Sequence, residues 1–173
     1  IELNENGRQQ AQNLARRLSG YGIDALYTSP YLRAVQTAEI ISSETGVEGT
    51  QLDDLREVDQ GYFVDVPIQE VNDAIEASDD PEHEWAPQGG ESMVKCRQRA
   101  VDTLLGLAEK HSGETVAAVA HGSFNKAAIL GILGYSTEHF DRMNQANCCL
   151  NMMRPAEHEI VSVNNVNHLQ KRF

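Results

Sequence analysis

Apolar and polar side chains follow a helical period in the first part of the chain. Within residues 4–20, small and apolar side chains recur at helical spacing, at Ala11, Leu14, Ala15 and Leu18. Asn4 precedes this stripe and predicts an N-cap. Residues 23–28 form a short apolar run typical of a strand, and Ser29-Pro30 predicts the cap and first turn of a second helix that continues through Ile41. This part of the chain therefore predicts a helix, a strand, a tight turn and a second helix.

The period weakens between residues 46 and 87. Residues 52–55 predict a short strand and residues 67–77 predict a helix. The apolar pattern of this stretch is too weak for elements of a central core. We therefore expect it to run as an excursion over the surface.

A clear pattern returns after Gly89-Gly90. Ser92 predicts the N-cap of a long helix with an apolar stripe. The period then changes, because residues 115–120 (TVAAVA) are an almost continuous apolar run, as expected for a strand buried on both faces. His121-Gly122 follows this run and turns the chain into a helix over residues 123–133.

Two further runs, residues 148–153 and 158–163, have the length and residue types of strands, and the second is less apolar and so nearer an edge. Strands that alternate with helices predict an α/β fold of three layers (α/β/α), in which a mostly parallel sheet carries helices on both faces. The 173 residues, 40% of them hydrophobic, suffice for one core. No repeat or linker interrupts the pattern, so we expect residues 1–173 to form a single domain.

The charge of the chain restricts its partners. The formal net charge is −12, from 14 Lys and Arg against 26 Asp and Glu. Nucleic acids and anionic membranes are bound by clustered positive charge, so we expect neither as a partner. The sequence shows no membrane span and no signal peptide, and its three cysteines lack metal-ligand spacing and favour a reducing cytoplasm. We expect an acidic cytoplasmic protein that uses no metal or other cofactor, and a homodimer stays open.

Two polar residues follow apolar strands, at the positions where ligands bind in open α/β sheets. Arg33 lies in the first turn of the helix after residues 23–28, where its permanently charged guanidinium can bind phosphate oxygens beside a helix N-terminus. His121 lies at the carboxyl end of the most apolar strand. Taken alone, such an arginine is commonly a surface residue and such a histidine a core residue, but their combination favours an anion site.

Five segments, in chain order, are similar to segments of the histidine phosphatase (phosphoglycerate mutase-like) superfamily. They are LNENGRQQA from Leu3, TSPYLRAVQTA from Thr28, LREVDQG from Leu55, GGES from Gly89 and VAHGS from Val119. The closing Asn167-His168-Leu169 also resembles the end of that family's chains. The protein is therefore identified as a member of this superfamily, in its phosphatase-like branch. The resemblance implies a phosphoglycerate mutase-like fold and a small phosphorylated substrate.

The resemblance also implies roles for individual residues. Arg33 holds the phosphoryl oxygens, His121 stabilises charge on the phosphoryl group, and Glu57 is the general acid or base. Gly122 and Ser123, which follow His121, are expected to bind the substrate as well. These roles suit phosphoryl transfer, which needs positive charge at the equatorial oxygens and a proton for the departing alkoxide. Without the resemblance, Glu57 would fit equally well in a solvated acidic loop.

The nucleophile of this family is the histidine of an Arg-His-Gly segment that ends the first strand. No Arg-His-Gly occurs in the sequence, and its first residue is Ile1. A missing strand would leave unpaired backbone and an open apolar slot in the sheet, at a cost of several kcal/mol. We therefore expect the domain to be incomplete at its N-terminus, with an Arg-His-Gly strand upstream of Ile1 that forms a phosphohistidine.

Three functions fit these observations. They are hydrolysis of phosphate monoesters, cofactor-dependent phosphoglycerate mutation, and binding of a phosphorylated ligand without catalysis. Only 64 positions separate Glu57 from His121 (121 − 57 = 64), too few for the long insertion expected in a mutase. Lys and Arg are also absent between Arg56 and Lys95, although a doubly phosphorylated intermediate would need several cations. The sequence therefore favours a phosphatase for small phosphate esters.

Overall fold

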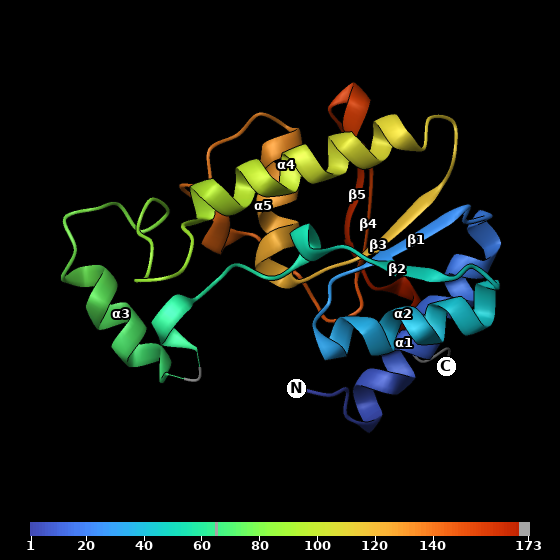
Figure 1. The fold of residues 1–173 in the computed structure, drawn as a ribbon, viewed down its shortest axis with the longest axis horizontal. Coiled ribbons are helices and arrows are strands. Elements are labelled where there is room, and N and C mark those ends of the chain that lie inside the picture. Colours follow the sequence, from blue (N-terminus) through green and yellow to red (C-terminus); the bar gives the residue numbers. More distant parts are fainter. Residues whose placement is uncertain (65, 170–173) are drawn as a thin grey trace.

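The centre of the computed structural model, which describes residues 1–64 and 66–169, is a parallel sheet (Figure 1). Its strands are β1 (Ala25–Thr28), β2 (Gly49–Gln51) and β3 (Val116–Val119), in the order β2-β1-β3. A separate antiparallel pair is formed by β4 (Leu150–Arg154) and β5 (Glu159–Asn165). Parallel strands end at the same edge of a sheet, so the residues that follow β1 and β3 meet there.

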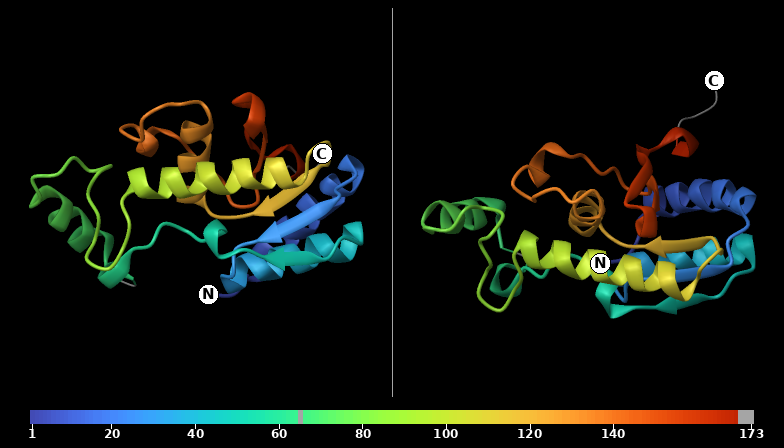
Figure 2. Two further views of the ribbon diagram at one scale, coloured as in Figure 1. Left: turned by 45° about the horizontal axis from the view of Figure 1, so that its top comes forward. Right: turned by 90° about the horizontal axis from the view of Figure 1, so that it is seen from above.

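Helices cover both faces of this sheet, as Figures 1 and 2 show. The described residues form the helices α1 (Glu5–Leu18), α2 (Leu32–Thr45), α3 (Ile68–Glu76), α4 (Met93–Lys110) and α5 (Gly122–Ile132). Helices α1 and α2 pack together on one side, and α4 and α5 pack together on the other. Helix α3 stands away from the sheet, within the surface excursion that the sequence predicts.

Neighbouring side chains of β1 show why there are three layers. Leu26 packs in a cluster with the apolar faces of α1 and α2, whereas Tyr27 packs in a second cluster with α4 and α5. Successive side chains of a strand point to opposite faces of the sheet, so an apolar residue at each position needs a helix layer on each face. The predicted α/β fold with helices on both faces of a parallel sheet is confirmed.

The predicted N-caps are confirmed at two of three places. The side chains of Asn4 and Ser92 accept hydrogen bonds from the backbone N–H groups that follow them and so cap α1 and α4. Ser29 does not cap a helix, because the backbone of Tyr31 is still extended and α2 begins only at Leu32. The serine hydroxyl instead contacts His121, which follows the neighbouring strand β3.

Three strand predictions need correction. The strand expected at residues 52–55 lies earlier, as β2, and Asp53–Leu55 forms a single 3₁₀ turn. The run at residues 115–120 does form β3, but it is only half-buried and Ala118 is exposed. The cause is an open cavity beside β3, described below. The strand expected from Cys148 begins at Leu150, because Cys148 has a left-handed backbone with a φ of 53°.

Candidate active site

Arg33 and His121 meet at the carboxyl end of the sheet. Arg33 lies in the first turn of α2, after β1, and His121 is the residue from which α5 starts, after β3. Because β1 and β3 are neighbouring parallel strands, their following turns bring the two side chains together. The distance between Nη2 of Arg33 and Nδ1 of His121 is 3.0 Å.

The contacts of His121 define its protonation. A guanidinium can only donate, so Nδ1 of His121 accepts the hydrogen bond from Arg33 and carries no proton. Its Nε2 then carries the proton and donates it to Oγ of Ser29, at 2.7 Å. Burial, together with the positive charges of Arg33 and Arg99, lowers the pKa of His121 to about 4. The imidazole is therefore held neutral, with both nitrogens in use.

Sequence reasoning missed two residues of the segment that carries Arg33. Ser29 is fully buried, and its hydroxyl joins the backbone after β1 to the imidazole of His121. The ring of Tyr31 lies 5.2 Å from the ring of His121 and 5.2 Å from the guanidinium carbon of Arg33. Both residues belong to TSPYLRA, so the signal was present in the segment, but their contacts depend on how β3 is placed.

Glu57 comes from the loop that follows β2 and the 3₁₀ turn, and it binds the N-terminus of α5. Its Oε1 accepts from the backbone N–H of Phe124 at 2.9 Å and from that of Val58 at 3.0 Å, and its Oε2 accepts from that of Ser123 at 3.2 Å. The first N–H groups of a helix lack partners within the helix and stabilise a negative charge. The carboxylate of Glu57 is thereby fixed at the backbone of Ser123 and Phe124, which follow His121 closely in the chain.

The predicted site residues thus lie at one place in the fold. Arg33, Glu57, His121 and Gly122 all line the same cavity, and Ser123 adjoins it, with its N–H bonded to Glu57. This arrangement offers a permanent cation, an imidazole and a carboxylate around one volume. These groups can bind the oxygens of a phosphate and move a proton.

The cavity is larger than a small ligand needs. Its volume is about 1170 Å³, and it continues from the site along the whole of β3 to β4. Apolar residues of both helix layers face it, including Leu14 and Leu18 of α1 and Leu104 and Leu107 of α4. Among the described residues, β3 pairs only with β1, and β4 pairs only with β5. The cavity therefore lies between two strands that each have an unpaired edge.

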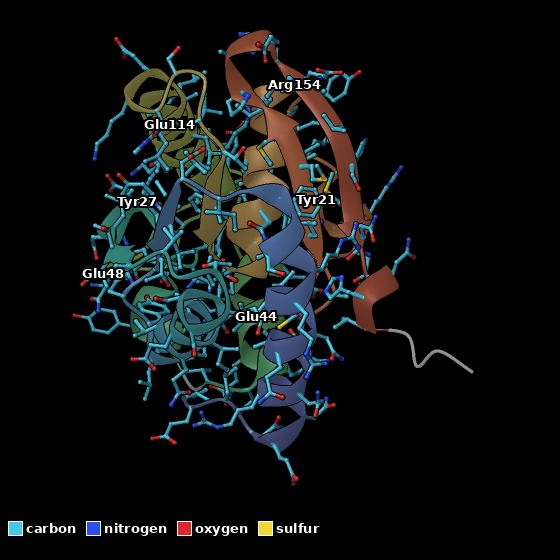
Figure 3. The ribbon with its side chains drawn as sticks, turned by 90° about the vertical axis from the view of Figure 1, so that its right-hand side faces the viewer. Tyr21, Tyr27, Glu44, Glu48, Glu114 and Arg154 are labelled. Atoms are coloured by element: carbon cyan, nitrogen blue, oxygen red, sulfur yellow. The ribbon has the colours of Figure 1, made fainter. Side chains whose placement is uncertain are left out.

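The two ends of the cavity differ. Glu2, Leu3 and Asn4 line the cavity as well, and the N–H of Leu3 donates to the side chain of Gln36 in α2, close to Arg33. The first residues of the chain therefore lie at the end that holds the site. At the opposite end, the cavity is lined by Tyr21, Glu114 and Arg154, which come from three parts of the chain and lie on the face that Figure 3 shows.

Within the described residues, no group of three or more His, Cys, Asp or Glu side chains is arranged to hold a metal ion. Over the same part of the chain, every helix is too short or too polar to cross a bilayer.

Known proteins are similar to this chain in sequence and in fold. The model of the histidine phosphatase superfamily (branch 1) matches residues 1–167. The chain is 38% identical over 129 residues to phosphoglycerate mutase-like protein 4 of Arabidopsis thaliana, which covers 70% of this chain and 56% of that protein. It is 29% identical over 144 residues to phosphoserine phosphatase 1 of Hydrogenobacter thermophilus, covering 80% of this chain and 68% of that one.

A solved structure gives the same result. A phosphoserine phosphatase mutant from Entamoeba histolytica, in complex with phosphoserine, superposes with a TM-score of 0.85 at 28% identity and covers 98% of this chain and 87% of that chain. The chain therefore spans little more than half of the Arabidopsis protein but most of the solved phosphatase. With the match to the family model over residues 1–167, these findings show that the chain belongs to branch 1 of the histidine phosphatase superfamily.

Proposed function

We propose that this protein hydrolyses small phosphate monoesters through a phosphohistidine. The observation that carries the proposal is the contact between Arg33 and His121, 3.0 Å apart at the ends of neighbouring parallel strands, inside a cavity that Glu57 also lines. Arg33 binds the phosphoryl oxygens through its fork of N–H groups. His121 stabilises the charge that develops on them, and Glu57 supplies or accepts the proton of the ester oxygen.

The nucleophile enters, in this proposal, on a strand that fills the cavity between β3 and β4. We infer that the strand is an extended segment of the same protein, outside residues 1–173, and that it carries an Arg-His-Gly. It would run parallel to β3 and leave the cavity near Leu3, where the site lies. Its histidine would then stand beside Arg33 and His121.

Three features of the described residues support a strand as the occupant. The facing edges of β3 and β4 both offer backbone groups for pairing, and burying such groups without partners costs about 1–3 kcal/mol each. The apolar run of β3 suits burial on both faces, yet Ala118 is exposed. Apolar side chains from both helix layers point at the same space, as they do around an inner strand.

The substrate is proposed to be small and to carry one phosphate. Lys and Arg are absent from the sequence between Arg56 and Lys95, in the excursion before α4, so this segment offers no cation for a second phosphate. Two of the similar proteins are named phosphoserine phosphatases, which favours a phosphorylated amino acid as the substrate class. We place the protein in the cytoplasm, because its three cysteines are free thiols.

The test is an assay of the full-length protein on p-nitrophenyl phosphate, O-phosphoserine and 3-phosphoglycerate. Release of inorganic phosphate supports the proposal, and conversion of 3-phosphoglycerate to its isomer supports a mutase instead. Binding of phosphate without any turnover supports a binding protein. The phosphohistidine is sought by intact mass after rapid quenching in alkaline denaturant, because the P–N bond of phosphohistidine is hydrolysed in acid. Turnover without a phosphorylated histidine upstream of Ile1 would overturn the inferred strand.

A variant links the activity to the observed site. His121→Ala is expected to abolish turnover while the fold stays intact, as judged by circular dichroism. Gly106→Ala is a matched control, because that position in α4 has nothing within 4 Å of the added carbon. Equal turnover of both variants would rule out the proposed site.

A further inference from the structure

A buried ion pair lies beside the loop that carries Glu57. Arg99 is in α4, and Glu91 comes just before the residue that caps α4. Only 12% of each side chain is exposed. Arg99 binds the Glu91 carboxylate at both oxygens, through Nη2 to Oε1 and through Nε to Oε2 at 3.3 Å. The pair is a two-pronged one, which fixes the orientation of both groups.

The same pair holds the loop on both sides of Glu57. Before Glu57, Nη1 of Arg99 donates to the backbone oxygens of Asp54 at 2.6 Å and Arg56 at 3.0 Å. After Glu57, the N–H of Asp59 donates to Oε1 of Glu91 at 3.2 Å, and the N–H of Glu91 donates to the oxygen of Asp59 at 2.9 Å. The backbone on either side of Glu57 is therefore attached to one rigid pair.

Arg99 also contacts the helix that Glu57 caps. Its guanidinium carbon lies 5.5 Å from the centre of the Phe124 ring, in the first turn of α5. The N–H of Phe124 is one of the donors to Glu57. Arg99 therefore contacts both the loop that carries the Glu57 carboxylate and the helix end to which this carboxylate is hydrogen-bonded.

Stability alone does not explain such a pair. Replacing a buried ion pair by apolar residues is often neutral or stabilising, because removing two charges from water is costly. The placement of a reacting group is more demanding, since an error of about 1 Å can lower a rate about 100-fold. Because the pair makes four contacts to this loop, we infer that it controls the position of the loop and of the Glu57 carboxylate.

We propose that Arg99 and Glu91 are positioning residues that place the Glu57 carboxylate for proton transfer to the leaving oxygen. The inference rests on the proposed function, because it concerns the acid of that same site. It goes beyond that function because it assigns the accurate placement of the Glu57 carboxylate to two residues that do not touch the substrate.

Leaving groups give a readout that a merely structural role would not move. A serine alkoxide needs a proton as it departs, whereas p-nitrophenolate leaves without one. We expect Arg99→Met in the full-length protein to lower kcat/KM about 100-fold for O-phosphoserine and only a few-fold for p-nitrophenyl phosphate. Glu57→Gln should show the same selective loss. Arg99→Lys should recover little, because one ammonium cannot reach two carbonyls and a carboxylate together.

A second measurement does not depend on turnover. Hydrogen exchange of the Ser123 and Phe124 amides, which donate to Glu57, should be about tenfold faster in Arg99→Met. Arg97→Met is the matched control, since Arg97 lies in the same helix but donates to the oxygen of Tyr135, away from the loop. Glu91→Gln, which keeps an acceptor for Asp59, should show a smaller effect and guards against misfolding of the arginine variant.

The outcomes separate the two proposals. In one outcome, Glu57→Gln lowers kcat/KM for O-phosphoserine selectively while Arg99→Met lowers kcat/KM for both esters alike. In that case the positioning inference is wrong and the proposed function stands. Unchanged exchange at Ser123 and Phe124 in Arg99→Met also overturns the inference, with or without turnover. If Glu57→Gln affects both esters equally, Glu57 is not the acid, and the proposed function fails in that part together with the inference.

Discussion

The neutral state of His121 predicts a specific loss of stability in acid. Burial and the neighbouring cations lower the pKa of His121 from 6.5 to about 4 in the folded protein. In the unfolded chain the ring titrates at its ordinary pKa. A group whose pKa is lowered by folding contributes its full stability above the unfolded pKa and loses it as the pH falls toward the folded one. The contribution of His121 is therefore complete at pH 7 and falls from about pH 6.5 downward.

The size of this loss follows from the two pKa values. The unfolding free energy should drop by about 2 kcal/mol at pH 5 and by about 3 kcal/mol at pH 4 through His121 alone. Urea unfolding of the natural protein and of His121→Gln, each at pH 7 and pH 5, isolates this part, because all other groups titrate in both. Glutamine has no proton to gain in this range. The drop should be about 2 kcal/mol larger in the natural protein.

Two further experiments test the causes of the lowered pKa of His121. Arg33→Met removes the second cause and should reduce the acid loss without abolishing it, because burial is the larger cause. Inorganic phosphate that binds Arg33 would take over its N–H groups and release Nδ1 of His121 to carry a proton. Saturating phosphate should therefore also reduce the loss. An acid loss of the same size in the natural protein and in His121→Gln would refute the neutral, doubly bonded imidazole.

Four other changes test single positions. Arg33→Lys should weaken phosphate binding by about 1–3 kcal/mol in a titration, because an ammonium cannot form the two-pronged contact. Ser29→Ala should lower kcat with a smaller change in KM, since His121 loses the acceptor of its Nε2 proton, and a normal kcat would contradict that role. Gly131→Ala should destabilise by about 1–3 kcal/mol, because the added carbon would stand 2.3 Å from a methyl group of α4. Gly106→Ala, with open space around it, should instead stabilise by up to about 1 kcal/mol in the same thermal unfolding experiment.

Local chemistry made much of this structure predictable from the sequence. The caps at Asn4 and Ser92 and the apolar run of β3 depend on a few neighbouring residues, so the pattern is present in any short window. The meeting of Arg33 and His121 could also be predicted, because residues that follow parallel strands reach one edge of the sheet. The short strand β2 could not, since its three exposed residues bear no apolar period.

Other features of the site depend on contacts that no local pattern encodes. Ser29 reads as a helix cap in the sequence, and only the pairing of β1 with β3 directs its hydroxyl to a histidine 92 positions away. The carboxylate of Glu57 reaches the N–H groups of α5 because Arg99 and Glu91 hold its loop against α4. Such contacts come from packing between separate elements, and the sequence states only which chemical groups are present.

The cavity beside β3 connects the part of the site that is described with the part that is proposed. A run such as TVAAVA is stable in water only when both of its faces and both of its edges are covered. In the described residues one edge of β3 faces about 1170 Å³ of open space, and the unpaired edge of β4 faces the same space. An added strand would pair both edges, cover Ala118 and end beside His121. One segment would thus complete the sheet and deliver the nucleophile, so stability and catalysis should be gained or lost together when that segment is changed.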